Sequence, residues 1–354
     1  MHRKNKQVFK IIVAFFFLLA GLTSCNNSNL IQNNTSKPDS IGRIAEVLVV
    51  LQNTDQWHGP IGKVIRKFFQ APVYGFPQYE PIFKVLHIGQ SKFVGAFKTQ
   101  REIFFVKINP KIKEPKIEIA KDEWAYPQIV IYLTAPSVES FVDVFKNRHD
   151  YFIQRYMKYE RDRLQALFKT ALDAKVIKKI QNKFGFSLEI PLGYYLAKTE
   201  PGFMWIRHEA SLYSQGIIII SLPYVDTAQF SRDKILQRIQ KFQQKYIPGP
   251  TNGSYMALDR KYMIPRAATI TNFPTKYAVR IAGLWRVEND FMGGPFISYT
   301  FLNPKNKQIV TLFGYVYYPN HKKRDYMLQV ESILYSVNFS PQANTKMKKA
   351  AEKH

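Results

Sequence analysis

The single cysteine of this 354-residue sequence, Cys25, closely follows an apolar segment near the N-terminus. Four Lys or Arg residues and no acid lie in the first ten positions, and residues 8–22 are apolar apart from Lys10. This run is short for a membrane span and is typical of a secretory signal. A chain with one cysteine cannot form an intramolecular disulfide, although the compartment of an exported protein would permit such a bond. The fold must therefore be stabilised by its core alone.

The residues that end the apolar segment, Leu22-Thr23-Ser24-Cys25, resemble the lipobox of bacterial lipoproteins. In that family the signal is cut immediately before the cysteine, which then receives a lipid. The resemblance implies a signal peptide at residues 1–24 and a membrane anchor on Cys25. The alternative is an ordinary signal peptide that ends near an unrelated cysteine.

Residues 25–42 would connect this anchor to the rest of the chain. They are polar, rich in Asn and Ser and without periodicity, so we expect a flexible tether. Asn26 differs from the aspartate that retains some lipoproteins in an inner membrane, and no acidic cluster resembling a surface-export signal follows it. We therefore expect the protein in the outer membrane, lipid-anchored and facing the periplasm.

The chain is strongly basic, with 51 Lys and Arg against 26 Asp and Glu and a net charge of +25. In a cytosolic protein this balance would favour nucleic acid, but export argues against that partner. The anions of an envelope are phospholipid headgroups, lipopolysaccharide phosphates and cell-wall carboxylates. A basic segment gains on the order of 1 kcal/mol per Lys or Arg near an anionic membrane. The charge has two alternative explanations. One is contact with such a component, and the other is a lineage whose periplasmic proteins are generally basic.

The first half of the mature chain, residues 43–183, is predicted to combine a sheet with helices. Its β-branched segments predict strands at 45–51, 82–88, 103–108 and 128–134. A long helix is expected from about Ser137 to Leu172. Its expected buried stripe is Phe141, Phe145, Phe152, Tyr156, Leu164, Leu167 and Phe168. The basic run from Lys146 to Lys183 is interpreted as one charged helix, either simply solvated or facing an anionic surface.

The second half, residues 184–340, has strands separated by Pro, Gly and Asn turns. Short turns between successive strands require antiparallel pairing. Helices are expected at 231–247, with Ser231 as the N-cap, and near 323–339. The prediction is therefore an α+β fold of two sheet-plus-helix halves, the second a mainly antiparallel sheet backed by helices. Residues 341–354 are expected to be a disordered basic tail.

The segment with the most polar and aromatic side chains is WRVENDFMGGPF, which runs from Trp285 to Phe296. It is expected to join two strands, with Gly293 and Gly294 supplying positive φ in the turn. Glu288 and Asp290 alternate, so their carboxylates point to one side of an extended chain. The candidate ligand-binding residues are Trp285, Arg286, Glu288, Asn289 and Asp290 here, with Tyr255 and Trp57 from two other turns.

Five segments are very similar to a family of uncharacterised envelope lipoproteins from Bacteroidetes, classed as a domain of unknown function. The segments are EVLVV (46–50), DEWAYPQ (122–128), SQGI (214–217), YIPGPTNGSYM (246–256) and GLWRVENDFMGGPF (283–296). The resemblance covers nearly all of the mature chain and implies an envelope lipoprotein with an α/β body. The family has no established activity, so it implies no catalytic residue.

Signals for catalysis and for metal binding are weak. No pair of the seven histidines has metal-ligand spacing, and Ser231-x-x-Lys234 lacks the partner motifs of penicillin-binding enzymes. No metal or cofactor is expected. The sequence favours a non-enzymatic binding or scaffolding role towards a protein partner or an anionic envelope component. The alternative is a periplasmic hydrolase acting on glycan or cell wall through Glu288 and Asp290.

Overall fold

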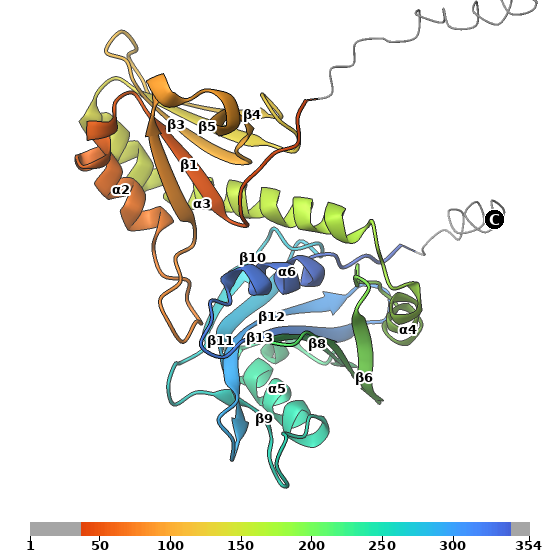
Figure 1. Ribbon diagram of the computed structural model, residues 1–354. Coiled ribbons are helices and arrows are strands. Elements are labelled where there is room, and N and C mark those ends of the chain that lie inside the picture. Colours follow the sequence, from red (N-terminus) through yellow and green to blue (C-terminus); the bar gives the residue numbers. More distant parts are fainter. Residues whose placement is uncertain (1–36, 341–354) are drawn as a thin grey trace, which may run out of the picture. The chain divides into compact units, whose positions relative to one another are not determined.

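The first sheet of the computed structural model, which describes residues 37–340, has five strands (Figure 1). They are β1 (Glu46–Leu51), β2 (Lys84–Gly89), β3 (Glu102–Ile108), β4 (Lys116–Lys121) and β5 (Ile129–Ala135). Their order in the sheet is β2-β1-β3-β5-β4, parallel except for β4 at the edge. A parallel strand is covered on both faces, and all six residues of β1 are buried. The sequence missed β4, which is largely exposed at this edge.

Two helices cover one face of this sheet, α2 (Pro60–Phe69) and α3 (Val138–Phe168). The predicted long helix is confirmed, and the Ser137 hydroxyl accepts a hydrogen bond from Ser140 N at its start. Most of the predicted stripe is buried, but Leu167 is 56% exposed. Three short 3-10 helices complete this half, namely η1 (Thr54–Trp57), η2 (Gln90–Lys92) and η3 (Gly95–Thr99). Phe93 and Trp124 pack on the opposite face of the sheet.

The prediction of one charged helix from Lys146 to Lys183 is wrong. Helix α3 ends at Phe168, and α4 (Ala174–Phe184) begins after Asp173, whose carboxylate accepts hydrogen bonds from the N–H groups of Lys175 and Val176. Asp173 lies inside the predicted single helix, but in the structure it is the N-cap of a new helix. Its side chain accepts hydrogen bonds from N–H groups that have no backbone acceptor in the first turn. Helix α4 packs its apolar face in the core of the second sheet.

The second sheet confirms the α+β prediction, because every pairing in it is antiparallel. Its strands are β6 (Tyr194–Glu200), β7 (Phe203–Glu209), β8 (Ser214–Pro223), β9 (Tyr255–Asp259), β10 (Arg266–Ile270), β11 (Ala278–Glu288), β12 (Gly293–Asn303) and β13 (Gln308–Tyr317). The order is β10-β11-β12-β13-β8-β7-β6, and β9 also pairs with β11. The long strand β11 thus pairs with β10 along one part and with β9 along another.

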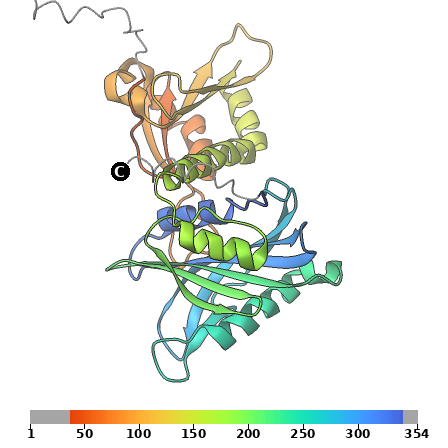
Figure 2. The ribbon, with the colours of Figure 1, turned by 90° about the vertical axis from the view of Figure 1, so that its right-hand side faces the viewer.

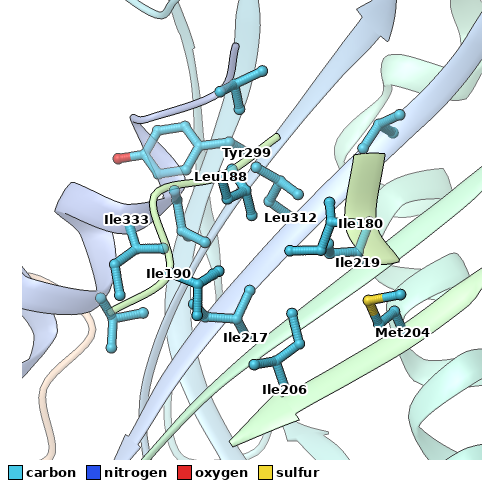
Figure 3. Close-up of a cluster of buried hydrophobic side chains, with 14 of the residues drawn as sticks. Ile180, Leu188, Ile190, Met204, Ile206, Ile217, Ile219, Tyr299, Leu312 and Ile333 are labelled. Carbon is cyan, nitrogen blue, oxygen red and sulfur yellow. The ribbon is translucent and has the colours of Figure 1, made fainter. Parts of the chain in front are cut away.

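Helices cover both faces of the second sheet (Figure 2). On one face, α4 and α6 (Arg324–Leu334) enclose a core that includes Ile217 and Ile219 (Figure 3). On the other face, α5 (Arg232–Tyr246) and η4 (Thr227–Phe230) pack over Ile218 and Ile220. Successive residues of a strand point to opposite faces, so four consecutive isoleucines are buried. Ser231 precedes α5 as predicted, but its side chain makes no capping hydrogen bond.

Polar contacts join the two sheet-plus-helix halves. The Glu80 carboxylate, from the segment between α2 and β2, accepts hydrogen bonds from Lys323 N and Arg324 N at 2.8–2.9 Å. Arg324 in turn donates to the carbonyl oxygens of Ile44 and Pro81 at 3.0 Å. Glu80 therefore caps α6, whose own N-cap residue makes no side-chain capping hydrogen bond. Among residues 37–340, no helix has the length and apolar character needed to cross a membrane.

Candidate ligand-binding site

The stretch from Trp285 to Phe296 contains the end of β11, the turn that follows it and the start of β12. The left-handed residue of this turn is Asn289, with φ of 63°. The prediction that Gly293 and Gly294 supply positive φ is wrong, because both lie in β12 and pair with Arg286 and Trp285. Asparagine reaches the left-handed region at lower cost than most residues. The glycines must therefore have another role.

That role is close approach. A Cβ on Gly294 would overlap the carbonyl oxygen of Val316 and lie 3.2 Å from Trp285 Nε1. The indole of Trp285 crosses β12 at this point and donates from Nε1 to Val316 O at 3.3 Å. A Cβ on Gly216 would similarly overlap the ring of Tyr315. These two glycines make room for two buried aromatic side chains on the α5 face of the sheet.

The two aromatic side chains line a pocket of about 260 Å³. Its walls come from β7, the start of β8, the loop after α5, β9, the β11–β12 turn and β13. The lining residues are Trp205, Arg207, Ser214, Ile247, Pro248, Gly249, Pro250, Met256, Trp285, Val287, Met292 and Tyr315. Three of the segments that the family resemblance singled out therefore supply or support one pocket.

The wall of this pocket is mainly apolar, because the polar atoms of its aromatic side chains already have hydrogen-bond partners within the protein. Trp205 Nε1 donates to Tyr315 Oη at 3.0 Å, while Trp285 donates to a backbone carbonyl. Burial raises the pKa of Tyr315 to about 12, so its phenol stays neutral at physiological pH. Met256 and Met292 add flexible thioether side chains, which adapt to different ligand shapes.

Arg207 supplies the positive charge of the pocket. Its guanidinium lies 4.7 Å from the centroid of the Trp205 ring and forms an ion pair with Glu209. Arg207 Nε is buried and has no hydrogen-bond partner in the described part of the chain. A buried donor without a partner is costly. Arg207 is also the cationic side chain of the pocket wall, and it would attract an anionic group of a ligand.

The predicted polar residues lie beside the pocket rather than in its wall. Arg286 and Glu288 pair with each other at 2.5 Å, and the Asp290 carboxylate accepts from Met292 N at 3.1 Å within the turn. Asn289 is exposed and provides the turn conformation. Tyr255 pairs with Glu288 in the β9–β11 ladder, and its neighbour Met256 lines the pocket instead.

Trp57 belongs to a different part of the molecule. Its ring stacks on His87 with centroids 4.3 Å apart, and Arg66 covers it at 4.7 Å. A Cβ on Gly62 would lie only 2.5 Å from the Trp57 carbonyl carbon, so Gly62 allows α2 to pack against η1. Trp57 thus stabilises the first sheet, and the structure does not bring it together with Trp285.

Sequence reasoning missed Trp205, Arg207 and Tyr315. Their strands were expected, but nothing in a strand pattern shows which strands become neighbours. The only local signal was the glycine of SQGI, which faces Tyr315. Within residues 37–340, no group of three His, Cys, Asp or Glu side chains lies close enough together to hold a metal ion.

Two family models match the chain, and both describe uncharacterised domains. One domain of unknown function (DUF8532) matches residues 40–169, which include the first sheet and α3. A second domain of unknown function (DUF4837) matches residues 173–336, which include the second sheet and the pocket. A comparison with curated proteins found no match.

Solved structures show only weak likeness to the chain. One is LpqN, involved in cell envelope biogenesis of Mycobacterium tuberculosis, at 15% identity over 43% of this chain and 83% of LpqN, with a TM-score of 0.26. Another is the human StarD13 (DLC2) lipid transfer and protein localization domain, at 8% identity over 45% of this chain and 94% of that domain, with a TM-score of 0.21. TM-scores this low carry no argument about function.

Proposed function

We propose that this protein is a cell-envelope lipoprotein that binds a partner protein with the pocket and the turns beside it. The proposal has two independent parts. The anchor rests on the sequence, because Cys25 lies outside the described residues. The binding role rests on the second sheet, and its main support is the exposed apolar turn beside the pocket.

The turns at the pocket end of the second sheet carry unusually exposed apolar side chains. The β11–β12 turn presents Phe291, which is 108% exposed, and the β7–β8 turn presents Leu212, which is 65% exposed. The two turns lie at the same end of the sheet, because Ser214, directly after the β7–β8 turn, and Met292, within the β11–β12 turn, both line the pocket. Exposed apolar side chains next to a preformed apolar pocket favour a protein-binding surface.

The chemistry of the partner follows from the pocket. A volume of about 260 Å³ is just below the range of about 300–1,000 Å³ typical of small-molecule sites. It is suited to one or two apolar side chains of a partner. The Arg207 side chain in the pocket wall favours a carboxylate nearby, and the large excess of Lys and Arg over Asp and Glu favours an acidic partner overall. We therefore infer an acidic envelope protein that inserts an apolar side chain.

The hydrolase alternative has no comparable support. Glu288 is paired with Arg286, and Asp290 accepts a backbone hydrogen bond within its own turn. Neither carboxylate lines the pocket. A pair of catalytic carboxylates is expected on opposite sides of a cleft that holds the substrate.

The binding proposal can be tested by photocrosslinking in living cells. A benzophenone amino acid at position 291 should give an adduct with one envelope protein, and Arg207→Met in the same chain should weaken it. Position 225 is the matched control, because Val225 is also 76% exposed but follows β8 at the opposite end of that strand. Equal adducts at both positions, or none at 291, would remove the support for a specific partner.

The anchor is tested separately by metabolic labelling with a radioactive fatty acid. The wild-type chain should be labelled and should fractionate with the outer membrane, and Cys25→Ser should abolish the label. Protease added to intact cells should leave the protein uncut if the protein faces the periplasm. Digestion without lysis would contradict the periplasmic orientation but not the lipid anchor.

A further inference from the structure

A second cavity, of about 380 Å³, lies between α3, α6 and β11. Strand β12 contributes Phe296 and Ile297, and the segment between α2 and β2 closes the wall with residues that include Val73 and Phe76. No residue of the first pocket lines it, so the two sites are distinct. Its volume falls in the range of about 300–1,000 Å³ typical of small-molecule pockets.

The wall formed by residues 70–83 is fixed in place at two points. Gly75, with φ of 95°, approaches β11 so closely that a Cβ would lie 3.1 Å from Gly283 N. Glu80 binds the backbone of Lys323 and Arg324 at the start of α6. The cavity is therefore part of the folded structure and does not depend on a mobile lid.

Most of the cavity wall is apolar. The side chains come from three elements that are distant in the sequence, and include Val73, Phe76, Ile82, Ile153, Met157 and Leu328. Such a wall gains about 25 cal/mol for each Å² of apolar ligand surface that leaves water. The body of a ligand here should therefore be hydrocarbon.

Three arginines also line the cavity, and two of them have partners. Arg324 pairs with Asp325 at 2.8 Å and donates to backbone carbonyls. Arg280 hydrogen-bonds to Tyr299, whose hydroxyl donates to the Glu331 carboxylate. Two positive charges are thus balanced by two carboxylates.

Arg161 is the third arginine and leaves one positive charge uncompensated. Its guanidinium lies 4.2 Å from the centroid of the Tyr335 ring. In residues 37–340, no carboxylate lies within ion-pair distance of it. Tyr335 also contacts Tyr299, with ring centroids 5.1 Å apart, so Arg161 lies beside the Arg280 group of residues. The cavity therefore combines a hydrocarbon wall with one arginine that has no ion-pair partner among the described residues.

We propose that this cavity binds an amphiphile with one carboxylate and an apolar chain, which is the chemistry of a fatty acid. The chain lies among the apolar residues, and the carboxylate pairs with Arg161. The planar guanidinium matches a carboxylate with two parallel hydrogen bonds. A phosphate monoester carries close to two charges at pH 7, and its second charge would face Glu331 without compensation.

The test uses the full chain in phosphatidylcholine nanodiscs, titrated with dodecanoate that carries ¹³C at the carboxyl carbon. The carboxyl resonance of the bound form distinguishes a saturable protein site from dodecanoate dissolved in lipid, and empty nanodiscs provide the blank. Arg161→Met should weaken binding at least tenfold, as expected for loss of its charge-assisted hydrogen bonds to the carboxylate. Arg155→Met is the matched control, since Arg155 is on the same helix, also covers a tyrosine, and lies outside the cavity.

Two further variants assign the site. Arg207→Met, in the first pocket, should leave dodecanoate binding unchanged. Val73→Trp should block the cavity, and its unfolding temperature shows whether the fold is retained. Absence of saturable binding, equal affinity for dodecanol, stronger binding of dodecyl phosphate, or equal effects of Arg161→Met and Arg155→Met would each overturn the proposal.

Discussion

Replacing Glu102 with glutamine tests how the core of the first sheet holds a carboxyl group. Glu102 begins β3 and is 1% exposed, and neither of its carboxylate oxygens has a hydrogen-bond partner in the described residues. Burial, followed by the negative charge of Glu160, raises its pKa well above the usual value. The positive charges of Arg101 and Arg163 lower the pKa of Glu102, but both arginines form ion pairs with Glu160, at 3.9 and 2.8 Å. Glu102 should therefore be protonated in the folded state at a pH where the unfolded chain is ionised.

The pH dependence follows from this difference. The stabilisation from a raised carboxyl pKa is fully present below the unfolded value of about 4.3 and is lost as the pH rises through the folded-state pKa. Between these two limits, one proton corresponds to about 1.4 kcal/mol of unfolding free energy per pH unit. Glutamine has a similar size and does not titrate. The stability of Glu102→Gln relative to wild type should therefore rise with pH at up to this slope.

The measurement is urea unfolding followed by circular dichroism at pH 5, 6, 7 and 8. Any constant cost of the buried amide shifts the whole difference curve, so the slope is the quantity to read. The control is Glu114→Gln, which removes a carboxylate from the exposed surface. Parallel curves for wild type and Glu102→Gln, or a slope of opposite sign, would refute the assignment of a protonated buried carboxyl.

Substitutions at three further positions test individual contacts. Gly216→Ala should destabilise the fold by about 1–3 kcal/mol, because its Cβ overlaps the Tyr315 ring; thermal unfolding measures this, and an unchanged midpoint would contradict the close approach. Glu80→Ala should lower the free energy of unfolding by about 1–3 kcal/mol, because two backbone N–H groups at α6 lose their acceptor. Amide hydrogen exchange should become faster first at α6, and a uniform increase would contradict this role. Asn289→Gly should leave stability nearly unchanged, whereas Asn289→Val should lower it by about 1 kcal/mol because of the positive φ; equal urea midpoints for the two variants would argue against a left-handed residue there.

The pattern of apolar residues was sufficient to identify most strands and helices. EVLVV and the isoleucine run of β8 are buried on both faces of their strands, so each is a continuous apolar segment in the sequence. The long helix α3 was evident from its aromatic spacing. Strands β4 and β9 were missed, since one is a largely exposed edge strand and the other has five residues. The break between α3 and α4 was missed because the charged residues on either side of it look alike.

The candidate sites were less predictable than the elements that form them. Trp285 lines the first pocket, whereas its polar neighbours Arg286 and Glu288 pair with each other. The second cavity had no sequence signal, because Arg161 and Arg280 each look like ordinary charged residues of a helix and a strand. A local pattern reports which face of an element is apolar. It does not report which element covers that face.

The sequence by itself thus determined the α+β class, the antiparallel character of the second sheet, and the expectation of an anchored, exported chain. These follow from the period of apolar residues, from turn residues and from residue types near the N-terminus, all of which are local. Only the tertiary structure decided that β13 lies between β12 and β8, and this order brings Tyr315 between Trp205 and Trp285. It also placed Glu80 at the start of α6, across more than two hundred residues of chain. Such neighbours depend on how whole strands and helices pack, which no short stretch of sequence specifies.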